Sequence, residues 1–138
     1  RAHVVLEHEV LAVLVAHAER TLVAHLAAAN DYEHAHFEGA EVQGALHAAK
    51  AVYCPAFFLT VSPRTLMAAG EHCAREDKLF ALNIAAPFLV QFFWEHFAAL
   101  LPYADVVIGN ESEGAAITEK LGGDVRGHSR LLLTALTG

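Results

Sequence analysis

The most restrictive feature of this sequence is a regular alternation of apolar strands and helices from residue 51 onward. Short aliphatic runs begin near residues 51, 79 and 104, and a helix-like segment fills each interval between them. Strands of one sheet that are separated by helices need crossover connections, which make them parallel. We therefore predict an α/β fold in which helices cover both faces of a mainly parallel sheet.

Local signals set the predicted boundaries. Ser62 and Pro63 provide an N-cap and a first-turn proline, Pro87 opens a further helix, and Gly122 with Gly123 stops the last one. From these signals and the apolar spacing we predict strands at 51–59, 79–84 and 104–108, and helices at 40–50, 62–77, from 87 onward and at 111–121.

The first part of the chain follows a different pattern. Residues 11–15 are aliphatic, and residues 20–26 alternate, with Leu22, Ala24 and Leu26 on one face of the second run. The polar stretch 17–19 separates the two runs, so the pattern predicts a β-hairpin that lies outside the parallel sheet. Residues 30–39 are polar, and we predict a loop there.

Length and charge narrow the classes of partner. The chain has 138 residues, the length of one domain or part of one, and a formal net charge of −7. Nucleic acids and anionic membranes would repel this net charge, and the Lys and Arg residues form no basic run. The longest charge-free segment, 79–94, is shorter than the ~20 apolar residues of a membrane span. We expect neither nucleic acid nor membrane as a partner.

The cysteines indicate the cellular compartment of the protein, and the first residue indicates where the sequence starts within it. Cys54 and Cys73 form no CxxC pair and no disulfide framework, which favours a reducing, cytoplasmic environment. The sequence begins with Arg1 rather than Met and opens without a signal-like segment. We therefore expect that an upstream part is missing.

Three segments follow the predicted strands, at the edge of the sheet where open α/β folds bind ligands. The first two, around Phe57 and Phe88, offer aromatic surface, and the third, at 109–113, offers amide and carboxylate oxygens. This combination suits a purine-like ligand together with a hydrated cation. A purely structural interpretation competes with it: both phenylalanines belong to the core, and Asn110 and Glu113 form a capping box at a helix start.

The histidines offer a weaker alternative. His34 and His36 lie near Glu33 and Glu38, but they lack the His-Glu-x-x-His spacing and a Cys partner. A solvated loop is therefore favoured over a zinc site. The sequence also contains no Gly-rich phosphate loop, no dinucleotide fingerprint and no G-x-S-x-G motif.

Four segments resemble adenosine kinases, in the same order. They are ERTLVAHLAAAN at 19–30, FFLTVSP at 57–63, LNIAAPF at 82–88 and LPYADVVIGNE at 101–111. The resemblance implies a ribokinase-like α/β/α sandwich with a mainly parallel sheet and a small β-hairpin lid, present here as a partial fold. Residues 1–30 would form part of the lid and its junction, and residues 31–138 part of the core domain.

The same resemblance implies a reaction and a nucleoside pocket. The reaction is the transfer of the γ-phosphate of ATP to the 5′-hydroxyl of adenosine, which gives AMP and requires Mg²⁺. By position, Leu22 and Ala24 would line the lid side of the pocket, and Phe57 and Phe88 would belong to its aromatic wall.

The resemblance also assigns residues to the phosphates. Arg20 would lie near the transferring phosphoryl group, where a guanidinium stabilises developing charge. Asn110 and Glu113 match the N-x-x-E motif of the family, which holds hydrated Mg²⁺. A helix start can act as a cap and as a cation site at once, so the two interpretations are compatible.

The chain departs from the family pattern in one important respect. The Gly-Ala-Gly-Asp motif, which carries the catalytic base and the anion hole, is absent, and the LGGD at 121–124 comes too early in the family order. We interpret the chain as the central portion of an adenosine kinase that is a monomer when complete, and expect it to be inactive alone. Two alternatives stay open: another ribokinase-like sugar kinase, and a non-catalytic nucleoside-binding domain of the same fold.

Overall fold

The computed structural model describes residues 10–16, 19–25 and 27–122. The chain divides between Glu33 and His34 into two compact units. In the first unit, β1 (Val10–Ala16) and β2 (Glu19–His25) form an antiparallel pair, and the 3-10 helix η1 (Ala27–Asp31) follows. The predicted hairpin is therefore confirmed. Of the predicted turn at 17–19, Glu19 is the first residue of β2. Residues 17–18 and Leu26 lie outside the described residues.

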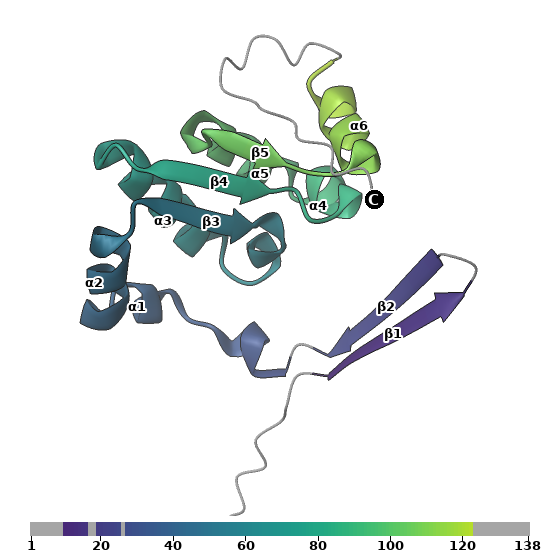
Figure 1. Cartoon of the computed structure of the whole chain (residues 1–138), viewed down its shortest axis with the longest axis horizontal. Coiled ribbons are helices and arrows are strands. Elements are labelled where there is room, and N and C mark those ends of the chain that lie inside the picture. Colours follow the sequence, from purple (N-terminus) through teal and green to yellow (C-terminus); the bar gives the residue numbers. More distant parts are fainter. Residues whose placement is uncertain (1–9, 17–18, 26, 123–138) are drawn as a thin grey trace, which may run out of the picture. The chain divides into compact units, whose positions relative to one another are not determined.

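The second unit is built on a sheet of three parallel strands. Strands β3 (Ala51–Pro55), β4 (Leu79–Asn83) and β5 (Val106–Ile108) lie in that order, as Figure 1 shows. The predicted parallel sheet is confirmed. The helices of this unit are α1 (His34–Phe37), α2 (Ala40–Ala48), α3 (Pro63–Arg75), α4 (Pro87–Phe92), α5 (Trp94–Leu100) and α6 (Glu111–Lys120), with 3-10 turns η2 (Ala56–Thr60) and η3 (Leu101–Tyr103).

Two predicted boundaries are wrong. The strand at 51–59 ends at Pro55, and η2 takes its second half. Ala56 and Leu59 are both buried, and residues three apart face opposite sides of a strand but the same side of a tight helical turn. The predicted loop at 30–39 overlaps the end of η1 and contains the single-turn helix α1, which is held by contacts to α3 rather than by its own propensity.

The helices that connect the strands cover one face of the sheet. Phe80 and Leu82 of β4 are fully buried, whereas Leu79, on the opposite face, is 45% exposed and Tyr53 of the neighbouring strand is 57% exposed. In Figure 1, α3 and α5 lie behind the strands. In the described part of the chain, the helices that connect these strands all lie on this one face.

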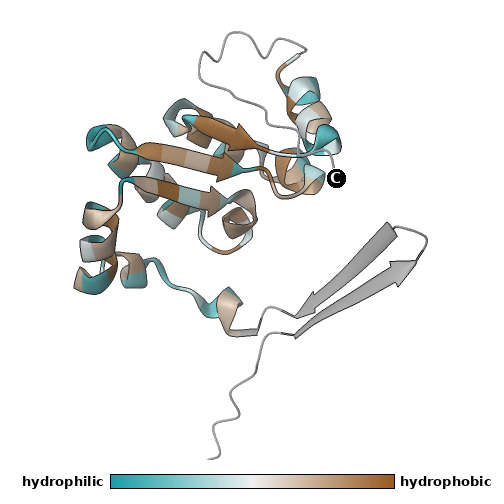
Figure 2. Cartoon of the chain, viewed as in Figure 1, coloured by the Kyte–Doolittle hydropathy of each residue, from teal (hydrophilic) through white to brown (hydrophobic). Residues whose placement is uncertain are grey.

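The strand order explains why the connecting helices share one face. Each crossover between parallel strands is right-handed, so strands that add in one direction place their connecting helices on the same face. The order β3-β4-β5 adds in one direction throughout. Figure 2 shows that the three strands are largely hydrophobic. On the face opposite the connecting helices, the side chains of Leu79 and Tyr53 are exposed.

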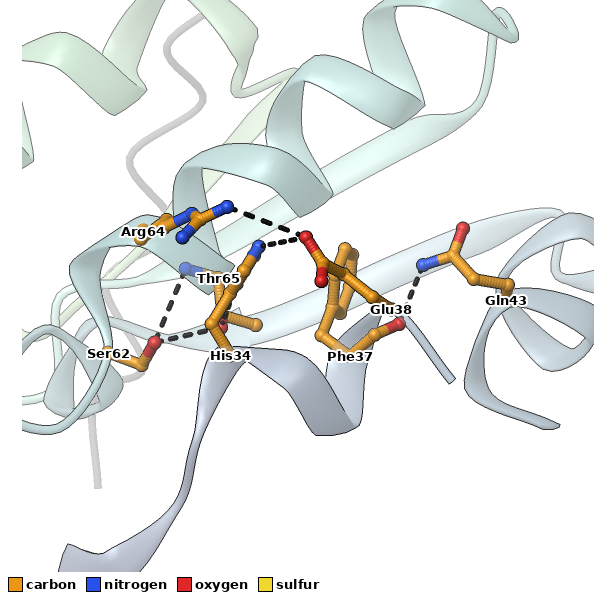
Figure 3. A network of polar contacts seen from close by, with 7 residues as sticks. All are labelled: His34, Phe37, Glu38, Gln43, Ser62, Arg64 and Thr65. Atoms are coloured by element: carbon orange, nitrogen blue, oxygen red, sulfur yellow. Dashed lines mark hydrogen bonds and ion pairs between the residues drawn. The ribbon is translucent and has the colours of Figure 1, made fainter. Parts of the chain in front are cut away.

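A polar network fixes the junction between β3 and α3 (Figure 3). His34 Nδ1 lies 2.8 Å from Thr65 Oγ1, which lies 2.8 Å from Ser62 Oγ, and Ser62 caps α3 by accepting from the backbone of Thr65. Glu38 pairs with both His34 and Arg64 at 3.4 Å. The predicted N-cap is confirmed, and the network ties α1 to the start of α3.

The helices of the described segments are all too short or too polar to cross a membrane. Cys54 and Cys73 are free thiols. Burial raises the pKa of the Cys54 thiol to about 11 and also raises that of Cys73, so both stay protonated at neutral pH. Neither cysteine is a candidate nucleophile.

Candidate functional site

The candidate site lies at the carboxyl edge of the three-stranded sheet. Because β3, β4 and β5 are parallel, their carboxyl ends meet at this edge, where the arrowheads point in Figure 1. β3 continues into η2, β4 into the turn at 84–86, and β5 into Gly109 and Asn110 at the start of α6. Each predicted aromatic or polar segment of the second unit therefore reaches the same edge.

The first component is an exposed aromatic pair. The rings of Phe57 on η2 and Phe88 on α4 meet edge to face, with their centroids 5.9 Å apart and their planes at 89°. Each side chain is 39% exposed, so the interpretation of these two residues as core is wrong. Phe58, by contrast, is half-buried and packs against the core. An exposed aromatic pair of this geometry offers π surface to a flat ligand.

The turn between β4 and α4 positions Phe88. Ala85 has a φ of 66°, and the Ala86 N–H donates to Ile84 O at 2.8 Å across it. Asn83 Oδ1 accepts from the Ala85 N–H at 2.8 Å. Sequence reasoning selected Phe88 from this segment and missed Asn83, although an Asn two residues before a bend is a known turn signal.

The second component is the start of α6, where Asn110 and Glu113 form a reciprocal capping box. Asn110 Oδ1 accepts from the Glu113 N–H at 2.9 Å, and Glu113 Oε2 accepts from the Asn110 N–H at 3.0 Å. Glu113 Oε1 also accepts from Asn110 Nδ2 at 3.1 Å. The predicted capping box is confirmed, and it places a largely buried carboxylate at the positive end of the helix.

Gly109 is required for this arrangement. A Cβ at this position would overlap Ile84 Cδ1 and would stand 3.0 Å from Glu113 Oε2. The β5–α6 junction therefore packs directly on the residue that precedes the Ala85 turn. Sequence reasoning missed this role, because only the packing of two distant segments reveals it.

The donor chemistry of the capping box suits a hard cation held through water. Mg²⁺ prefers oxygen donors and keeps several of its own waters. Both Glu113 oxygens already accept from Asn110, yet a carboxylate oxygen can accept more than one hydrogen bond. In the part of the chain that the structure describes, no group of three or more His, Cys, Asp or Glu side chains could hold a metal ion directly.

The remaining predicted site residues lie in the first unit. Arg20, Leu22 and Ala24 belong to β2, where they pair with Val15, Val13 and Leu11. The second unit brings Phe57 to Phe88 and Asn110 to Glu113, and the roles of the three β2 residues stay predictions.

Comparison with known proteins identifies the family of the chain. Residues 7–136 match the pfkB family of carbohydrate kinases. The chain belongs to this family. Among relatives of this pfkB domain, the adenosine kinase of Dictyostelium discoideum is 44% identical over 110 residues, which are 80% of the chain. Adenosine kinase 2 of Arabidopsis thaliana is 43% identical over 101 residues, which are 73% of the chain.

Solved structures support the fold of the pfkB domain. The Schistosoma mansoni adenosine kinase in complex with 2-fluoroadenosine superposes with a TM-score of 0.84 at 28% identity, over 98% of this chain and 45% of that one. The Anopheles gambiae adenosine kinase in complex with P1,P4-di(adenosine-5) tetraphosphate gives 0.81 at 29% identity, over 92% of this chain and 43% of that one. The predicted ribokinase-like fold is confirmed.

This chain covers only part of the length of the relatives that it matches. The chain spans 32% of the Dictyostelium enzyme and 29% of the Arabidopsis enzyme, and less than half of each structure named above.

Proposed function

We propose that the protein to which this chain belongs transfers the γ-phosphate of ATP to the 5′-hydroxyl of adenosine, which gives AMP and ADP. The observation that carries this proposal is the exposed Phe57–Phe88 pair at the carboxyl edge of the sheet. A purine gains stacking and apolar contact from such a pair, whereas a sugar alone does not require it. The similarity to adenosine kinases supports the same choice.

In this proposal apolar residues bind the nucleoside. Phe57 and Phe88 contact the purine, and the family pattern assigns Leu22 and Ala24 to the same ligand.

The phosphates require positive charge and a cation. Arg20 would stabilise the charge that develops on the phosphoryl group during transfer. Asn110 and Glu113 would hold Mg²⁺ through its waters, and Mg²⁺, when bound, supplies positive charge beside the phosphates. The general base that accepts the proton of the 5′-hydroxyl is assigned to a Gly-Ala-Gly-Asp motif outside these 138 residues.

The proposal extends to partners and compartment. Adenosine and ATP are the proposed ligands, without nucleic acid or membrane, and the complete protein would act as a monomer. The free, protonated thiols of Cys54 and Cys73 support a reducing cytoplasm.

A substrate comparison tests the proposal. The complete gene product is incubated with ATP labelled in its γ-phosphate, Mg²⁺ and one acceptor at a time: adenosine, inosine, ribose or fructose. We expect labelled AMP and a higher kcat/KM for adenosine than for either sugar. Preferential phosphorylation of ribose or fructose would favour the alternative of a sugar kinase. Adenosine binding without turnover would favour a non-catalytic nucleoside-binding protein.

A further inference from the structure

A strained turn joins β4 to α4 immediately before the aromatic residue of the candidate site. The hydrogen bond from the Ala86 N–H to Ile84 O spans one residue, Ala85, whose φ is 66°. An i to i+2 bond around a positive central φ is a rare and strained type of γ-turn. A non-glycine residue in this region costs about 1–3 kcal/mol and persists only where its surroundings hold it.

The side chain of Asn83 holds this turn. Its Oδ1 accepts from the Ala85 N–H at 2.8 Å, and its Nδ2 donates to the Tyr53 hydroxyl oxygen at 2.9 Å. Because the Ala85 N–H can only donate, the amide oxygen faces the turn, and the amide nitrogen is left to donate to the Tyr53 hydroxyl. Asn83 thus links two neighbouring strands to the strained residue, and it lies on the sheet face opposite the buried Leu82.

The turn determines where Phe88 lies. Ala86 is extended and Pro87 is the first residue of α4, so the direction of the helix start depends on the conformation of Ala85. Phe88 is the next residue, and it meets Phe57 across an edge-to-face contact. A relaxed turn would move the start of α4 and separate the two rings.

We infer that Asn83 is a positioning residue for the nucleoside base: it holds Ala85 in the left-handed region and thereby fixes Phe88 against Phe57. This inference rests on the proposed function for its substrate, since it assumes that the aromatic pair contacts adenosine. Asn83 acts through Phe88, so it affects the binding of the base and leaves the transfer of the phosphoryl group unchanged.

The test is a rescue experiment in the complete gene product. Asn83→Ala removes the bond to the Ala85 N–H, and we expect the KM for adenosine to rise about three- to tenfold. We expect kcat and the KM for ATP to change by less than about twofold. In the double variant N83A/A85G, glycine adopts a positive φ without help, so most of the lost affinity should return.

Gln43→Ala is the matched control. Like Asn83, Gln43 uses its side-chain amide to hydrogen-bond the backbone: its Nε2 donates to Phe37 O at 2.7 Å. Gln43 lies on α2 rather than beside the Ala85 turn. Its removal should leave the KM for adenosine unchanged. If Asn83→Ala does not yield folded protein, Ala85→Val replaces it, because a β-branched residue raises the strain while Asn83 stays in place.

The inference is overturned if the replacement at position 83, or its substitute at 85, leaves the KM for adenosine unchanged, or if A85G does not rescue N83A. Crystal structures of N83A and of the double variant provide a readout that does not depend on activity. The ring centroids, 5.9 Å apart here, should separate in the first and return in the second. A wild-type protein that does not phosphorylate adenosine would overturn the proposed function, and the ring positions would still decide the role of Asn83.

Discussion

Phe88 and Phe92 lie one helical turn apart on α4, and they differ in what they contact. Phe88 meets Phe57 edge to face, whereas Phe92 is 78% exposed. We expect Phe88→Ala to raise the KM for adenosine about fivefold, since aromatic contacts contribute ~1 kcal/mol beyond the area they bury. Phe92→Ala, on the same helix, should leave this KM unchanged. Steady-state kinetics of the complete protein measure both, and equal effects of the two substitutions would remove Phe88 from the nucleoside wall.

Glu113 has two roles that substitutions can separate. Glutamine at this position can still accept the bond from the Asn110 N–H through its one amide oxygen. Glu113→Gln therefore removes the charge and the bond from Asn110 Nδ2 but keeps the bond that closes the capping box. Loss of a group that orients a metal ion typically reduces metal affinity or activity about ten- to hundredfold. We therefore expect Glu113→Gln to lower kcat and raise the Mg²⁺ requirement, with little change in Tm.

Two further variants complete this comparison. Glu113→Ala should in addition lower the free energy of unfolding by about 1 kcal/mol, because it also removes the bond that the Glu113 side chain accepts from the Asn110 N–H. Glu111→Gln is the control for the helix dipole, since Glu111 is exposed in the same first turn. A Mg²⁺ dependence that is the same in Glu113→Gln and in the wild type would leave Glu113 as a helix cap only.

At the scale of elements, the buried His72 on helix α3 packs against helix α2. The His72 ring meets that of His47 on α2 edge-on, at 5.3 Å between centroids. Arg75 Nη2 lies 3.3 Å from His72 Nδ1, and because arginine can only donate, the proton of the neutral ring is on Nε2. In the described part of the chain, this Nε2 is the buried side-chain polar atom without a hydrogen-bond partner.

The environment of His72 lowers the pKa of its ring below the ordinary value of 6.5. Burial is the main cause, and the charges of Lys78 and Arg75 act in the same direction. Below about pH 6.5, His72 therefore binds a proton in the unfolded state but stays neutral in the folded state. The free energy of unfolding falls as the pH falls. The stability that comes from keeping His72 neutral is fully present above pH 6.5. It is lost as the pH falls from 6.5 to the lower pKa of His72 in the folded state.

Urea unfolding of the complete protein at several pH values tests this expectation. Between pH 7 and 5.5 the free energy of unfolding should fall by up to about 1.4 kcal/mol per pH unit from this group. His72→Gln should make the decline shallower, whereas His96→Gln, at an exposed position on α5, should not. The same slope in all three proteins would mean that His72 protonates equally in the folded and unfolded states.

At the scale of the whole molecule, the open face of the sheet governs how this chain behaves alone. Tyr53 and Leu79 are exposed on that face, and β3 and β5 form its two edges. Uncovered apolar strands and free edges promote association. We therefore expect the 138-residue chain to be partly folded or prone to aggregation when it is expressed by itself.

The isolated chain should also lack activity. A hydroxyl nucleophile needs a base within hydrogen-bond distance, and the motif proposed to supply it lies outside these residues. With labelled ATP, adenosine and Mg²⁺, we expect no AMP above background, and a hydrophobic dye should bind more strongly than it does to the complete protein. Clear adenosine-dependent AMP formation by the isolated chain would show that the base was assigned incorrectly.

The features that could be predicted from the sequence are those set by residues close together in the chain. The N-cap at Ser62 and the box of Asn110 with Glu113 depend on contacts three residues apart, so they follow from local spacing. The parallel sheet follows from the repeated strand-helix pattern. The proposed family followed from four short segments, and the match over residues 7–136 agrees with it.

Other features required contacts between distant segments. A continuous apolar run does not reveal which face a helix will cover, and only the order β3-β4-β5 placed the connecting helices on one side. Phe57 and Phe88 come together although 31 positions separate them, which no local pattern encodes. The positive φ of Ala85 costs energy that no local preference supplies; it persists because Asn83, anchored to Tyr53 on the next strand, holds the turn in place.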